Sequence, residues 1–146
     1  MATEKLKFKL ELYATMWDKP PVADIKINEK SFFKEEITST NDKPTIIEFE
    51  HELEEGKSYS LIIDRLGKDT SQCKLKDGKI IKDQLLFLIK IMLNDMDIEK
   101  LIYSAKYTVG TEVKNEITVL GQNATWCLEF ETPLYMWFLE NTFKQT

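Results

Sequence analysis

The chain has 146 residues, of which 42% are apolar and 31% are charged, so it can bury one core of ordinary size. It contains one His and two Cys, which excludes His-based metal cages and a disulfide framework. The formal net charge of −5 disfavours a nucleic-acid partner, because phosphate binding needs a basic surface.

The sequence offers no targeting signal or membrane span. Residues 1–5 open directly into alternating charge, without the apolar stretch of a signal peptide. The longest nearly apolar run, 85–93, is too short to cross a bilayer. We therefore expect no membrane partner, and we expect Cys73 and Cys127 to be free thiols made in a reducing cytosol.

Alternating apolar and charged residues predict antiparallel strands with one buried face in the first half of the chain. These strands cover residues 5–12, 24–28, 45–53 and 58–66. The Glu-Glu-Gly-Lys sequence at 54–57 is typical of a tight turn, so 45–66 is expected to form a hairpin. His51 falls on the apolar face of its strand, which favours a structural role over acid–base chemistry.

The second half of the chain predicts further strands. Asp-Gly is favoured in type I′ turns, so the segment 74–82 around Asp77-Gly78 is expected to form a small hairpin. The apolar run 85–93 predicts a central strand buried on both faces, although periodicity alone does not separate it from a buried helix. More strands are expected over 101–109, 117–120 and 124–131, the last with Trp126, Leu128 and Phe130 inward.

The last segment changes from a period of two to the period of a helix. Thr132 can cap a helix, Pro133 suits its first position, and apolar residues follow at helical spacing over 133–143. Eight or so short strands without strand–helix alternation predict an all-β fold. We expect one antiparallel β-sandwich domain over 1–146, jelly-roll-like, with a short C-terminal helix.

Aromatic side chains are the candidates for ligand binding, because the sequence contains no recognisable catalytic motif. Trp and Tyr commonly anchor ligands and protein partners. Trp17 lies in a loop after the first strand, and Tyr103 and Tyr107 lie on a predicted strand. Trp126 fits the core side of its strand.

The turn at 94–97 is the candidate metal site. Asp95 and Asp97, together with Asn94, could supply the oxygen ligands that calcium prefers. The spacing is not that of an EF-hand, so the alternative is ordinary turn chemistry. No other cofactor is expected.

Several stretches of the sequence resemble small virion-associated proteins of tailed bacteriophages. They cover residues 21–28, 49–56, 77–84, 123–126 and 130–135. The general layout of those proteins is similar to jelly rolls of the carbohydrate-binding-module type, including the calcium-dependent xylan-binding type. Residues of that calcium-dependent sugar site are not matched in this sequence.

This resemblance implies a non-enzymatic module of a phage particle, made in the host cytoplasm and located on the virion. It would attach to another virion protein or to a surface carbohydrate, and it could form a homo-oligomer. A capsid decoration protein that stabilises the head is the main alternative. A small hydrolase remains a further alternative, since 25 acidic residues always place some carboxylates in pairs.

Overall fold

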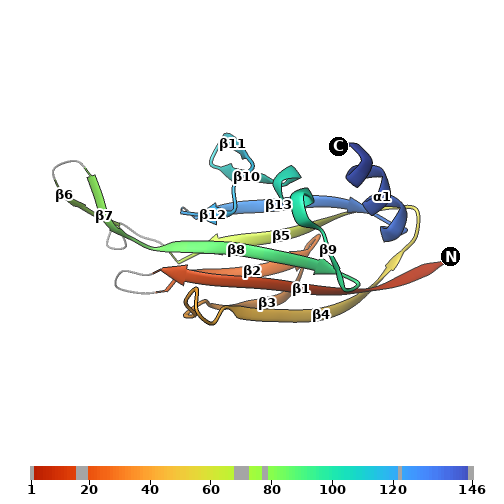
Figure 1. The fold of residues 1–146 in the computed structure, drawn as a ribbon, viewed down its shortest axis with the longest axis horizontal. Coiled ribbons are helices and arrows are strands. Elements are labelled where there is room, and N and C mark those ends of the chain that lie inside the picture. The colour runs from red at the N-terminus through yellow and green to blue at the C-terminus, as the bar shows by residue number, and fades with distance from the viewer. Residues whose placement is uncertain (1, 16–19, 68–72, 77–78, 122, 145–146) are drawn as a thin grey trace.

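The computed structural model describes residues 2–15, 20–67, 73–76, 79–121 and 123–144. Across these residues two antiparallel sheets face each other around one core, with a helix at one end (Figure 1). The predicted β-sandwich with a C-terminal helix is confirmed. Among the described residues, no helix is long and apolar enough to span a membrane.

The two sheets divide the strands without regard to their order in the chain. The five-stranded sheet has the order β12-β8-β1-β4 with β9 beside β8, and the six-stranded sheet has the order β11-β10-β13-β5-β2-β3. The first contains β1 (Thr3–Thr15), β4 (Thr45–Glu54), β8 (Leu85–Leu93), β9 (Met96–Asp97) and β12 (Val119–Leu120). The second contains β2 (Val22–Ile27), β3 (Lys30–Glu36), β5 (Ser58–Leu66), β10 (Lys106–Val109), β11 (Glu112–Asn115) and β13 (Ala124–Glu131).

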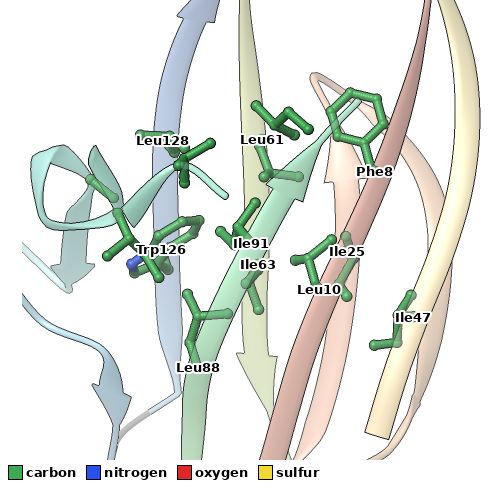
Figure 2. Close-up of a cluster of buried hydrophobic side chains, with 14 of the residues drawn as sticks. Phe8, Leu10, Ile25, Ile47, Leu61, Ile63, Leu88, Ile91, Trp126 and Leu128 are labelled. Carbon is green, nitrogen blue, oxygen red and sulfur yellow. The ribbon is translucent and has the colours of Figure 1, made fainter. Parts of the chain in front are cut away.

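The core lies between the sheets and follows the predicted alternation. On β13, Trp126, Leu128 and Phe130 are buried, as expected. The ring of Phe130 meets that of Phe8 in the opposite sheet at 6.0 Å, and Trp126 lies across from Leu88 (Figure 2). Burial of each such side chain contributes about 1.5–3 kcal/mol to stability.

The predicted hairpin over 45–66 is wrong, because its two strands belong to different sheets. β4 pairs with β1, whereas β5 lies between β13 and β2. The turn amides are bonded elsewhere: Glu55 N–H donates to the carbonyl of Ala2 and Gly56 N–H to that of Thr132, both at 3.0 Å. The turn therefore carries the chain across the core from one sheet to the other.

The apolar run of β8 is a central strand, as predicted, but the prediction of burial on both faces is wrong. Ile89 is 43% exposed. Glu11 of β1 pairs with Lys90 while Leu12 pairs with Leu88, so Ile89 has no partner on β1. This bulge shifts the alternation by one residue, and the core-facing residues are Leu86, Leu88, Ile91 and Leu93.

The predicted strand over 101–109 is wrong in its first half. Glu99–Ser104 forms a 3₁₀ helix, η2, and only Lys106–Val109 is a strand. The consecutive residues Leu101 and Ile102 are both buried, which an alternating strand does not allow. The strands β3 and β11 were not predicted, and the predicted segment 117–120 keeps strand geometry only over Val119–Leu120.

The strand pairing of the small hairpin predicted over 74–82 is confirmed, and its predicted turn at Asp77-Gly78 lies outside the described residues. β6 (Cys73–Lys76) pairs antiparallel with β7 (Lys79–Asp83) as a separate two-stranded sheet. In Figure 1 it projects from the body of the sandwich at the start of β8.

The C-terminal helix α1 (Leu134–Lys144) is also confirmed, but its N-terminus is held by a different residue than expected. Glu4 on β1 accepts a hydrogen bond from Leu134 N–H at 3.0 Å, and a carboxylate is favourable at this end of a helix. Thr132, expected as the cap, instead donates to the carbonyl oxygen of Glu54 at 2.7 Å.

At the end of the sandwich away from α1, one buried arginine side chain holds three connecting segments together. Arg65 is fully buried. Its guanidinium donates to the carbonyl oxygens of Leu120 at 3.1 Å and Gln84 at 2.5 Å, and to Oδ1 of Asn123 at 3.1 Å. It thereby ties the end of β5 to the segments that flank β8, β12 and β13.

Candidate functional site

The structure separates the aromatic residues that were predicted to bind a ligand. Trp17 lies outside the described residues. Tyr103 lies on η2 and is 48% exposed, whereas Tyr107 is 3% exposed on β10, where it pairs with Trp126 of β13. Of these three residues, Tyr103 is the one that the structure shows presenting an aromatic surface to solvent.

In the candidate calcium turn, both acidic side chains lie beside lysines. The carboxylate of Asp95 lies 3.5 Å from Nζ of Lys7, and that of Asp97 lies 3.7 Å from Nζ of Lys90. The side-chain oxygen of Asn94 accepts a hydrogen bond from Lys7 N–H at 2.8 Å. Across the described ranges, no group of three or more His, Cys, Asp or Glu side chains is arranged to hold a metal ion.

His51 packs at the open edge of the sandwich, where β3 and β4 flank the core. Its ring lies 5.0 Å from that of Phe32, which stacks in turn on Phe49 at 4.6 Å. Burial lowers the pKa of His51, and the positive charge of Lys30 lowers it further. His51 is therefore neutral at pH 7 and belongs to an aromatic cluster.

Two hollows adjoin along the outer face of β13, and we call them together the β13 groove. The larger has a volume of about 240 Å³ and is lined by Ser58, Glu129, Phe130, Glu131, Trp137, Glu140 and Asn141. The smaller has a volume of about 90 Å³ and is lined by Ser104, Lys106, Cys127 and Glu129. Because Glu129 lines both, the groove runs from η2 and β10 across β13 to α1.

The alternation of β13 explains how the floor of this groove forms. Since Trp126, Leu128 and Phe130 point into the core, the intervening residues point outward. The wall on the other side comes from one face of α1, where Trp137, Glu140 and Asn141 follow the i, i+3, i+4 spacing of a helix.

Trp137 and Asn141 are held in place by their neighbours. The ring of Trp137 meets that of Phe130 edge to face at 6.3 Å. The side-chain amide of Asn141 donates to the carbonyl oxygen of Trp137 at 2.8 Å. This wall of the groove is therefore ordered before any ligand arrives.

The groove offers many hydrogen-bonding groups and a graded charge. Glu129, Glu131 and Glu140 make the end beside α1 acidic, while Lys106 lies at the other end. Carboxylates accept hydrogen bonds, ammonium groups donate them, and hydroxyls and amides do both. Such a lining suits a ligand that carries many hydroxyl groups.

The sequence patterns do not predict this groove. The pattern of β13 shows that Glu129 and Glu131 point outward, but outward carboxylates are ordinary on a strand. Their neighbours come from η2, which precedes β13 by three strands, and from α1, which follows β13 directly. No local pattern predicts where these two segments pack. Of the predicted binding residues, Tyr103 is next in sequence to the lining residue Ser104 but lines neither hollow itself.

Comparison with known proteins identifies the fold. No family model matches the chain, and no curated protein matches it. A solved structure of the module vCBM60 in complex with galactobiose is similar, with a TM-score of 0.53, 6% identity, and coverage of 84% of this chain and 96% of that one.

The second similar structure is the selenomethionine form of vCBM60, from work on circular permutation between two families of calcium-dependent carbohydrate-binding modules. Its TM-score is 0.53 at 6% identity, and the match covers 84% of this chain and 89% of that one. The sandwich described here therefore has the fold of a carbohydrate-binding module.

Proposed function

We propose that this chain is a non-catalytic carbohydrate-binding module whose ligand lies in the β13 groove. The observation that carries the proposal is the groove itself: hydroxyl, amide, carboxylate and ammonium groups line two adjoining hollows. The exposed Tyr103 is next in sequence to the lining residue Ser104. The shared fold with a module that binds galactobiose supports the same class of ligand.

In the proposed complex, sugar hydroxyls donate to the carboxylates of Glu129 and Glu131 and accept from Lys106 and Asn141. Hydrogen bonds to charged groups contribute about 1.5–3 kcal/mol each, so two or three of them give a usable affinity. The ring of Tyr103 would pack against the apolar face of a sugar that extends beyond the smaller hollow.

The proposed complex contains no calcium ion. The fold neighbour belongs to work on calcium-dependent modules, but in this chain Asp95 and Asp97 each face a lysine. The phage-particle setting stays a prediction of the sequence resemblance. In that setting the module would attach the particle to a surface glycan.

Calorimetric titration with galactobiose, together with a glycan array, tests the proposal. We expect measurable binding of a neutral glycan, and we expect Tyr103→Ala and Glu129→Gln each to weaken it about tenfold, equivalent to about 1.4 kcal/mol. The matched controls are Tyr135→Ala, an exposed tyrosine of α1 that does not line the groove, and Glu48→Gln on the opposite sheet. Both controls should bind like the unmodified chain.

A flat response on the array and with galactobiose would overturn the proposal. Binding that Tyr135→Ala weakens as much as Tyr103→Ala does would overturn the assignment to the β13 groove.

A further inference from the structure

An apolar band crosses the outer face of the five-stranded sheet, on the far side of the sandwich from the β13 groove. Three of its members, Ile46, Ile89 and Val119, are 54%, 43% and 42% exposed. Between them lie Tyr13 and Phe87, which are half-buried. The five residues come from four neighbouring strands, β4, β1, β8 and β12.

The strand registers place these residues at nearly one level. Val119 pairs with Phe87, and Phe87 pairs with Tyr13. Glu11, which is two residues before Tyr13 on the same face of β1, pairs with Ile46. The bulge at Ile89 adds one more exposed apolar side chain next to this row. The band therefore extends across the full width of the sheet.

Toward the start of β1 and the end of β4, the same face is charged and internally paired. Lys5 lies 3.0 Å from Glu50, and Lys9 lies 3.9 Å from Glu48. Such ladders are ordinary on a solvated sheet, whereas a contiguous exposed apolar surface marks an interaction site. We therefore place the interaction site at the apolar band and not on the charged part of this face.

The geometry of the aromatic pair indicates what kind of partner the band accepts. The rings of Tyr13 and Phe87 stack with centroids 4.5 Å apart and planes 6° apart. Because stacking covers one face of each ring, the pair offers only part of its aromatic surface to a partner. This surface suits flat packing against protein better than stacking of a sugar ring.

We propose that the apolar band is the interface of a homodimer, a role separate from glycan binding. Consider a two-fold axis parallel to the strands, above the boundary between β8 and β1. Rotation about this axis places β8 of one copy over β1 of the other, so that Phe87 meets Tyr13 of the second copy. The same rotation places β12 over β4, the strand that carries Ile46. The band thus packs on itself, as a two-fold interface requires.

The charges beside the band are complementary in the same arrangement. Glu11 and Lys90 are paired in register on β1 and β8, so the same axis places Glu11 of each copy over Lys90 of the other. Glu11 forms no ion pair within the described part of the chain, and Lys90 lies 3.7 Å from Asp97. Two Glu11–Lys90 contacts would flank the apolar packing and fix its register.

Sedimentation equilibrium of the full chain over a range of concentrations tests the dimer. We expect a reversible monomer–dimer equilibrium whose dissociation constant rises at least tenfold in Ile89→Lys and in Val119→Lys. The matched control is Val113→Lys, an exposed valine of β11 in the other sheet, which should leave the equilibrium unchanged. Thermal melts of each variant show that the monomer still folds.

A charge exchange tests the orientation. Glu11→Lys should weaken the dimer, and the double variant Glu11→Lys with Lys90→Glu should restore it. A chain that stays monomeric at all concentrations would overturn the proposal, as would a dimer that Val113→Lys disrupts and Ile89→Lys does not. Glycan titration of Ile89→Lys should be unchanged, so failure of the dimer leaves the β13 groove unaffected.

Discussion

Leu88 and Ile91 both face the core, although residues three apart on a regular strand point to opposite sides of the sheet. The bulge at Ile89 allows both side chains to face the core, because this extra residue has no partner on β1. A register error of one residue on either side of it would turn core leucines to solvent.

Deletion of Ile89 should therefore abolish cooperative folding. Without the bulge, either Leu86 and Leu88 or Ile91 and Leu93 would point outward. Loss of a buried leucine or isoleucine costs about 2–5 kcal/mol, and two of them approach the whole stability of a typical domain, about 5–15 kcal/mol. Circular dichroism melts should show no sharp transition. Ile89→Thr keeps the residue count and should stay within about 0.5 kcal/mol of the unmodified chain; a cooperative melt of the deletion variant would contradict this role of the bulge.

Arg65→Met should destabilise the sandwich by about 3 kcal/mol or more. The change removes the donors for the carbonyl oxygens of Leu120 and Gln84 in a fully buried site, and unsatisfied buried acceptors each cost about 1–3 kcal/mol. Urea unfolding followed by tryptophan fluorescence measures the effect. Lys34→Met on the exposed side of β3 is the control and should change little. Equal stability of the two variants would show that Arg65 is dispensable.

Acid should weaken the fold through His51. Its pKa is lowered in the folded state by burial and by Lys30, so the unfolded chain binds this proton more readily than the folded chain. The stability is fully present above the unfolded pKa of about 6.5 and is lost as the pH falls through the lower folded pKa. The melting temperature should decline from pH 7 toward pH 5, and His51→Gln should decline less over the same range. Parallel curves for the two proteins would argue against His51 as the source.

Calcium should have no effect on stability or on glycan affinity. The carboxylates of Asp95 and Asp97 already face Lys7 and Lys90. The melting temperature should be the same in calcium and in a chelator, and Asp97→Asn should behave like the unmodified chain in both. A calcium-dependent rise in the melting temperature that Asp97→Asn removes would restore the turn as a metal site.

Local patterns predicted the strands better than the sheets. The alternation of Trp126, Leu128 and Phe130 was enough to place β13 correctly, because one-sided burial leaves a period of two in the sequence. The segment 45–66 shows what such patterns omit. Its strands and turn were correct, yet β4 and β5 lie in opposite sheets, because the choice of a partner strand depends on distant segments.

The groove was harder to predict than the fold for a similar reason. Tyr103 was predicted on a strand, and its 3₁₀ segment follows from the burial of the consecutive residues Leu101 and Ile102 against the sandwich. Glu129 becomes part of a groove only when η2 and α1 pack on either side of it. No single window of the sequence contains these neighbours.

The position of β13 sets the time at which this protein can fold during synthesis. β13 lies between β5 and β10 in the six-stranded sheet, so neither strand has this partner until residues 124–131 leave the ribosome. The first strand likewise waits for β4 and β8 on its two sides. Six of the ten ladders between described strands join strands that are not consecutive in the chain. The sandwich should therefore be completed only after residues 124–131 are made, and folding should be slow for a domain of this size, in milliseconds to seconds. During that interval the edge of β5 that later pairs with β13 is open, which makes expression at reduced temperature or with chaperones the condition under which soluble protein should be obtained.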